Sequence, residues 1–204
     1  MNDRRTALLV AAIDEIARKG TRGMRVEEVA KAARVSPALI YHHFGDRSTL
    51  LQNALEYIGQ TADAYTTPAG GTGRDMIEAV LLGEIQDDTG VRTNSAAWGE
   101  LRDTAIFDEA LRPTITRLTQ QWIDDLAALV QAGIDDGSIV AAHEIDATGV
   151  QLTALVEGIS SRWLTGQLTT TAARAHLVSM IHAVLDHGTN PPAKAGPRRP
   201  STRR

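Results

Sequence analysis

The side chains with the clearest chemical potential lie close together, between residues 34 and 47. Tyr41, His42 and His43 are consecutive, and Arg34 and Arg47 stand on either side of them. Phenol, imidazole and guanidinium groups donate hydrogen bonds to phosphate oxygens, and an imidazole can also reach the edge of a base. These residue types could therefore take part in binding a polyanion.

The elements that must position these groups can be read from the segment VEEVAKAARVSPALIYHHF, residues 26–44. A short amphipathic helix is followed by a tight turn and then by a second helix that begins at Pro37, with Ser36 placed to cap it. The second helix is too short to be stable alone. It must be held by packing of Val29, Ala30, Val35, Ile40 and Phe44. The pattern is that of a helix-turn-helix, whose second helix enters the major groove of DNA.

The rest of the chain repeats the helical period, and no convincing run of strand-like alternation appears. Gly20 follows two cations and is expected to end the first helix, while Asp46 is placed to cap the fourth. Apolar stripes predict further helices over about 74–88, 94–106, 108–136, 144–164 and 170–187. The predicted fold class is all-α.

At fixed spacing, several residues of the first 50 resemble the DNA-binding head of the TetR family of transcriptional regulators. The matching residues are Ala11-Ala12, Gly20, Ala30, Ala33, Val35-Ser36, Ile40-Tyr41, His43-Phe44 and Leu50. The resemblance implies a three-helix DNA-binding head, a helical ligand-binding and dimerisation body, and release of DNA when a small ligand binds. Repression is the default that it implies.

This chain departs from the family pattern at two positions. Arg34 stands where the family usually has Gly, and it bears a modest strain if the turn needs a left-handed conformation there. Arg47 replaces the usual Lys and keeps the charge, and its guanidinium can bond a phosphate through two N–H groups.

The resemblance divides the work of the recognition helix among its residues. Tyr41 and His43 are expected to bond phosphates, with Arg47 and Arg34 beside them. Apolar side chains at 37–39 fill the positions that usually face bases, while His42 either touches a base edge or stays with solvent or phosphate. The predicted DNA-binding residues are Arg34, Ser36, Pro37, Ala38, Leu39, Tyr41, His42, His43 and Arg47.

The body contains three tryptophans, Trp98, Trp122 and Trp163, on three separate predicted helices. Core packing explains any single one of them. The alternative is that Trp98 and Trp122 border a ligand cavity between helices, where sites in helical proteins form. Its apolar wall could come from Leu81, Ile85, Leu101, Leu126 and Leu155.

Glu157 lies in the otherwise apolar stretch LTALVEGISSRWL, where a carboxylate is costly unless it is paired. If Glu157 faces the cavity, a cationic or hydrogen-bond-donating ligand is favoured; if it faces the helix pair, it is structural. The segment also resembles the corresponding helix of the BetI-type subgroup.

The last two predicted helices carry wide apolar faces. Duplicated by a two-fold axis, they could make a four-helix dimer interface, or they could simply close the core of one chain. The resemblance favours the dimer, through Leu152, Val156, Ile159, Leu177, Ile181 and Val184.

Composition narrows the choice of function class. The chain has 204 residues and no cysteine, which excludes disulfides, thiolate metal sites and cysteine nucleophiles. His143-Glu144 lacks a second histidine at zinc-helix spacing, and no triad or phosphate-binding glycine loop is visible, so neither an enzyme nor a metal or cofactor is expected. The alternative to a DNA-binding regulator is a ligand-binding or scaffold dimer whose head does not read DNA specifically.

Charge is distributed unevenly between three predicted parts of the chain. The head, residues 1–48, is mildly basic or near neutral, the body, residues 49–188, is acidic, and residues 189–204 form a basic tail that is expected to be disordered. Such asymmetry suits a protein that presents one end to a polyanion. The expected partners are palindromic double-stranded operator DNA, a small-molecule effector and a second copy of the chain. The expected location is the cytoplasm, with no membrane association.

Overall fold

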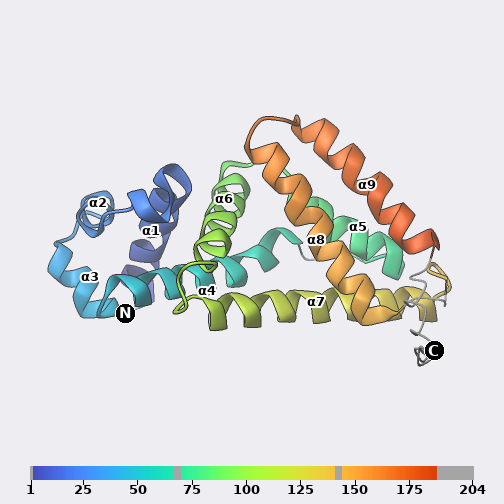
Figure 1. Ribbon diagram of the computed structural model, residues 1–204, viewed down its shortest axis with the longest axis horizontal. Coiled ribbons are helices and arrows are strands. Elements are labelled where there is room, and N and C mark those ends of the chain that lie inside the picture. The colour runs from blue at the N-terminus through green and yellow to red at the C-terminus, as the bar shows by residue number, and fades with distance from the viewer. Residues whose placement is uncertain (1, 67–69, 141–143, 188–204) are drawn as a thin grey trace, which may run out of the picture.

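Helices make up every regular element of residues 2–66, 70–140 and 144–187, the parts that this computed structural model describes (Figure 1). The helices are α1 (Asn2–Gly23), α2 (Val26–Ala32), α3 (Pro37–Phe44), α4 (Arg47–Thr66), α5 (Gly73–Gly83), α6 (Thr89–Thr104), α7 (Arg112–Asp135), α8 (Ile145–Leu164) and α9 (Thr170–His187). The all-α prediction is confirmed. The predicted basic tail lies outside the described residues, as does His143.

Several helix ends differ from the sequence prediction for identifiable reasons. Gly20 does not end α1 but kinks it, with φ 71° and ψ 167°, and a last helical turn continues to Gly23. Between α5 and α6 the chain leaves its helix at Gly83, and Asp88 caps α6 by accepting a 3.0 Å hydrogen bond from the Val91 amide. A cap of this kind satisfies an orphan N–H and moves the start of α6 ahead of the predicted residue 94.

The head packs around its own core. Leu8 and Ile16 of α1, Val29 of α2, Ile40 of α3 and Leu50 of α4 are buried in one cluster. This cluster continues along α4 and includes Ala97 and Leu101 of α6. In Figure 1, α4 runs out of the head toward the body, and α6 stands between the two. The head's core is thus continuous with α4 and α6.

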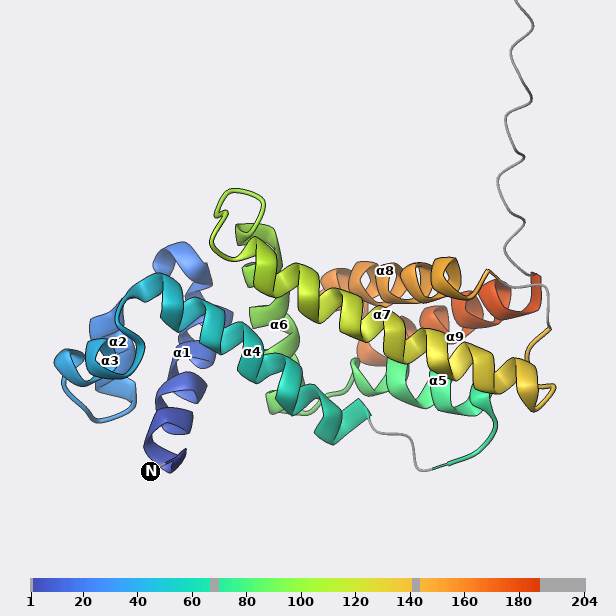
Figure 2. The ribbon, with the colours of Figure 1, turned by 90° about the horizontal axis from the view of Figure 1, so that it is seen from below.

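The body packs around a second core, formed by α5, α7, α8 and α9. Seen from below, α7 runs along the length of the body with α8 and α9 behind it (Figure 2). The N-terminus of α5 approaches the end of α7 closely: a Cβ on Gly73 would lie 2.2 Å from the Gly133 nitrogen. Only glycine allows the two backbones to come this near.

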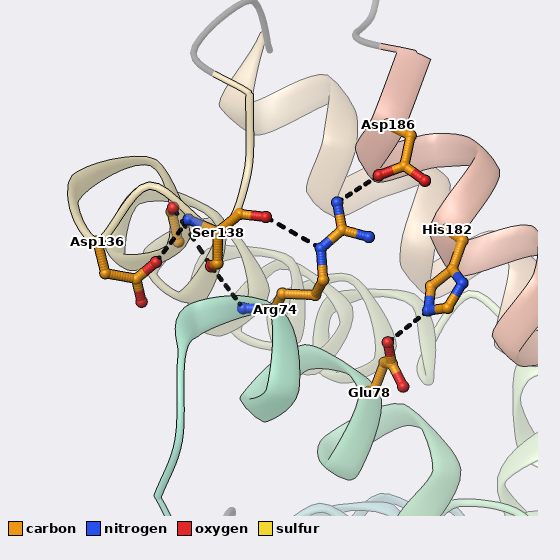
Figure 3. A network of polar contacts seen from close by, with 7 residues as sticks. Arg74, Glu78, Asp136, Ser138, His182 and Asp186 are labelled. Atoms are coloured by element: carbon orange, nitrogen blue, oxygen red, sulfur yellow. Dashed lines mark hydrogen bonds and ion pairs between the residues drawn. The ribbon is translucent and has the colours of Figure 1, made fainter.

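Polar contacts fasten the end of the body that lies away from the head (Figure 3). Arg74 of α5 donates from Nε to the Ser138 carbonyl at 3.0 Å and pairs with Asp186 of α9. His182 Nε2 lies 2.6 Å from Glu78 Oε1, which joins α9 to α5 a second time. This end of the helix bundle is therefore held by polar contacts as well as by its core.

None of the helices in the described ranges is both long enough and apolar enough to cross a membrane.

Candidate functional site

The turn between α2 and α3 has the geometry that the departure at residue 34 implied. Arg34 has φ 55°, and the Val35 amide donates to the Ala30 carbonyl at 2.9 Å. Left-handed backbone costs a non-glycine residue roughly 1–2 kcal/mol. The expected strain at Arg34 is therefore present, and its side chain is left exposed at the edge of α3.

Helix α3 has one buried and one outward side, as the spacing predicted. Ile40 and Phe44 are buried against the rest of the head. The opposite side carries the predicted DNA-binding residues: Arg34, Ser36, Pro37, Ala38, Tyr41, His42 and Arg47 are exposed, and Leu39 and His43 are half-buried. All nine residues are thus at least partly exposed. Ser36 occupies the N-cap position, but its hydroxyl makes no capping bond, so that part of the prediction is wrong.

Arg47 has an additional structural role that the sequence did not show. Its guanidinium donates to the carbonyl of Thr21, in the short turn that follows the kink of α1. An arginine has five N–H groups, so this bond leaves others available for a phosphate. Arg47 therefore ties the start of α4 to the end of α1 while remaining on the exposed surface.

A cavity of about 910 Å³ lies within the helices behind the head. Its walls come from α1, α4, α5, α6, α7 and α8. Apolar lining includes Leu118, Leu129 and Leu164, and several carboxylates and amides project into the same space. The volume and the mixed lining suit a small organic molecule.

Four predicted ligand-site residues line this cavity: Trp98, Trp122, Leu126 and Glu157. Leu101 and Leu155 do not, and neither do Leu81 and Ile85, so those placements are corrected. Leu101 is fully buried in the core that joins the head to α6, and Leu155 packs in the core of the body. Trp163 is a core residue too, since it is 1% exposed and donates to the Thr170 hydroxyl at 2.9 Å.

Glu157 lines the cavity and is paired at the same time. It accepts a 3.2 Å hydrogen bond from Trp98 Nε1 and forms a 3.2 Å ion pair with Arg102 of α6. Its negative charge is therefore already compensated by the chain. The partner, Arg102, comes from a helix distant in sequence, so residue spacing could not reveal the pair.

Glu84 is a cavity residue that the sequence analysis missed. It is the residue directly after α5, and its side chain is half-buried and lines the cavity. Burial raises the pKa of the Glu84 carboxyl to about 7. The sequence does contain a feature that could have indicated this residue, because the Glu84 carboxylate lies in the apolar segment VLLGEI.

The connection between cavity and head runs through α6. Glu100 lines the cavity and accepts a 3.0 Å hydrogen bond from the Thr21 amide of α1. Thr104, one turn further along α6, shares a 2.6 Å hydrogen bond with the Thr21 hydroxyl. Gly20 also lines the cavity, and a Cβ there would lie 2.8 Å from the Glu100 carboxylate. The kink of α1 thus rests directly on the cavity wall.

The predicted dimer residues have a different place from the one expected. Leu152, Val156, Ile159, Leu177 and Ile181 are at most 7% exposed within a single chain, and Val184 packs against them. They close the core of the body, which corrects their assignment to an interface. The outward side of α8 and α9 instead exposes the small residues Ala154, Ala175 and Ser179 together with Val150 and Met180.

Within the described ranges, no group of three or more histidine and acidic side chains gathers as a metal site.

Comparisons with known proteins match both halves of the chain. A model for bacterial regulatory proteins of the tetR family matches residues 8–54. A model for the C-terminal domain of BetI-type transcriptional repressors matches residues 73–186. The boundary between them falls along α4 and the segment that follows it.

Individual relatives agree with these models. The BetI transcriptional regulator of Rhizobium meliloti is 30% identical over 145 residues, which cover 68% of this chain and 70% of that protein. Other BetI regulators align over about half of their own length.

Solved structures show the same fold. A structure described as a TetR-family transcriptional regulator from a Rhodococcus species is 44% identical, has a TM-score of 0.85, and is matched over 91% of this chain and 100% of its own. A regulator from Saccharomonospora viridis in complex with choline is 20% identical with a TM-score of 0.79, over 89% of this chain and 97% of its own. At that identity, the second likeness shows the fold alone.

Proposed function

Because this chain belongs to the TetR family of transcriptional regulators and carries a BetI-type C-terminal domain, we propose that it represses transcription by binding operator DNA. A small effector that enters the 910 Å³ cavity would then release the protein from that DNA.

The observation that carries this proposal is the double role of α6. Trp98 and Arg102 of this helix face the cavity, while Glu100 and Thr104 hold Thr21 of α1. An effector that moves α6 must therefore disturb the bonds that set the end of α1. Because Arg47 bonds the same residue, the disturbance would also reach the start of α4, beside the recognition helix.

The proposal also includes a homodimer, formed by the outward side of α8 and α9. Small side chains allow helices of two chains to approach closely, and one helix pair duplicated by a two-fold axis makes a four-helix interface. Two heads related by this axis would contact a palindromic operator, with half-sites about one helical turn or a little more apart.

A gel shift with the DNA that flanks its own coding sequence tests DNA binding. We expect a preference for that DNA over random DNA, and a steep loss of affinity with salt. Equal affinity for both DNAs would favour the alternative, a ligand-binding or scaffold dimer that does not read sequence.

Sedimentation tests the dimer, with Ala154→Glu as the variant. The substitution places a charge on the outward side of α8 and should give a folded monomer. Ala64→Glu, at an exposed position of α4, is the matched control and should leave the dimer intact. A monomeric unmodified protein at micromolar concentration would contradict the proposal.

A further inference from the structure

The cavity wall is strongly unbalanced in charge. It contains seven acidic residues, Glu56, Asp63, Glu84, Glu100, Asp103, Asp125 and Glu157, but only two basic ones, Arg102 and Arg117. Both arginines already form ion pairs with acidic residues of the wall: Arg117 with Glu56, and Arg102 with Asp103 and Glu157. A ligand therefore meets a wall with excess negative charge.

Glu84 is half-buried on this wall, and burial raises the pKa of its carboxyl to about 7. The cavity-facing groups beside it are the Tyr65 phenol of α4, whose pKa is raised by burial and then by Glu84 itself, and Asn94 of α6. Arg174 of α9 donates to the Leu82 and Ile85 carbonyls rather than to this carboxyl. In the described part of the chain, no hydrogen bond or ion pair satisfies the Glu84 carboxyl, although it faces the cavity.

The exposed rim of the cavity is acidic as well. Asp63 of α4 and Asp125 of α7 both lie there. The pKa of Asp125 is raised by partial burial and then by the neighbouring charges of Asp63 and Asp124. Like charges that face one another attract cations and raise their local concentration at the entrance.

Much of the rest of the wall is apolar. Val80, Leu118, Trp122 and Leu129 line it together with Leu164. Three aromatic side chains, Tyr65, Trp98 and Trp122, line the same cavity. The wall therefore suits an alkyl or aryl chain and also offers the carboxylate of Glu84.

From this arrangement we infer that the effector is an amphiphilic organic cation with N–H groups. It is a primary or secondary ammonium on an apolar chain, and the ammonium donates to Glu84. The inference deepens the proposed function and rests on it. Glu157 is not the receiving group, because Arg102 and Trp98 already occupy its oxygens. An N–H donor is required since a carboxylate withdrawn from water needs hydrogen bonds as well as charge.

The test uses four probes with the same eight-carbon chain: octylammonium, octyltrimethylammonium, 1-octanol and octanoate. Binding to the full-length protein is followed by tryptophan fluorescence and by thermal shift. We expect octylammonium to bind at least about tenfold more tightly than octanol or the trimethylated cation, because only it makes charge-assisted hydrogen bonds. Its affinity should rise several-fold from pH 6 to pH 8, as the Glu84 carboxyl ionises.

Glu84→Gln is the decisive variant. It should lose about tenfold in octylammonium affinity and also lose the pH dependence, while octanol binding stays unchanged. Glu27→Gln, an exposed substitution in α2, is the matched control and should behave like the unmodified protein.

Three outcomes would overturn the inference: octylammonium does not bind, it binds no better than octanol, or its affinity is unchanged in Glu84→Gln. The proposed function is judged separately by gel shift. If octanoate or octanol releases operator DNA and octylammonium does not, the proposed repressor function is supported and the inferred class of effector is wrong. If the protein shows no preference for operator DNA, the repressor itself fails.

Discussion

The head and the body are both helical and both have an apolar core, but the interior of the head is packed, whereas the body contains a cavity. In the head, Leu8, Ile16, Val29 and Ile40 are at most 1% exposed, and the polar groups of α3 lie outside. The body instead surrounds a cavity of about 910 Å³ and keeps carboxylates in its wall. The head must present a fixed surface, whereas the body must hold space for a ligand.

This difference has a thermodynamic consequence. Side chains that line a cavity contact fewer protein atoms than side chains in a filled core, and a carboxyl partly withdrawn from water is disfavoured in its charged form. The body therefore gives up stability that a filled core would have, and a ligand that fills the cavity restores part of it. Four predictions test this contrast, from the largest expected effect to the smallest.

Truncating an aromatic side chain should cost far more in the head than beside the cavity. Phe44→Ala removes a buried ring that also lies under the Arg5 guanidinium, and it should lower the free energy of unfolding by about 3–5 kcal/mol. Trp122→Ala only enlarges an existing void and should cost about 1–2 kcal/mol. Urea unfolding measures both. Equal costs would show that the body is packed as tightly as the head.

Removing the charge of Glu84 should stabilise the protein in alkaline solution. The pKa of this carboxyl is about 7 in the fold against 4.5 ordinarily, so the folded state binds more protons than the unfolded state between these values. Stability from this group is full below pH 4.5 and is lost as the pH rises to 7. Glu84→Gln should therefore raise the free energy of unfolding by up to about 3 kcal/mol at pH 8 and by little at pH 4.5.

Thermal unfolding from pH 4.5 to 8 measures this effect, with Glu27→Gln as the control. If Glu84→Gln and Glu27→Gln give parallel curves, the Glu84 carboxyl is not held in its neutral form by burial.

The contact between α6 and α1 should be weakened by Glu100→Gln. The substitution replaces a charge-assisted bond to the Thr21 amide with a neutral one, a loss of about 1–2 kcal/mol. Amide hydrogen exchange at Thr21 should become about tenfold faster, because the end of α1 opens more often. Glu109→Gln, on an exposed loop, serves as the control. Unchanged exchange at Thr21 would mean that the head does not depend on this bond.

The recognition surface should show the smallest effects and a division of labour. Leu39→Ala should lower the preference for operator over random DNA by about 1 kcal/mol, since an apolar side chain can contact thymine methyl groups. Arg47→Ala should weaken both kinds of DNA by similar amounts, because a phosphate contact carries no sequence information. The measurement is the ratio of operator to random DNA affinity for each variant at one salt concentration, which shows which residue reads sequence and which contacts phosphate. If only Arg47→Ala abolished the preference for operator DNA, the roles assigned to Leu39 and Arg47 would be reversed.

Local signals were enough to predict the head. Periodicity, Pro37 at the start of a helix and Asp46 before α4 act within one or two turns of chain, and the structure confirms the helices that they define. The left-handed turn at Arg34 followed from a single substitution in a recognisable pattern. What was missed in the head, such as the bond from Arg47 to Thr21, joins residues distant in sequence.

The amino-acid sequence by itself determined that this protein is all-helical and which side of α3 faces outward, because an apolar stripe fixes the buried side of a helix. It could not determine what each stripe packs against. The apolar pattern of Leu177 and Ile181 allowed both a dimer and the core of one chain. The family resemblance favoured the dimer, and only the tertiary structure placed them in that core. The same holds for the cavity, since Arg102 pairs with Glu157, and Glu84 lines the cavity, only after distant helices have come together.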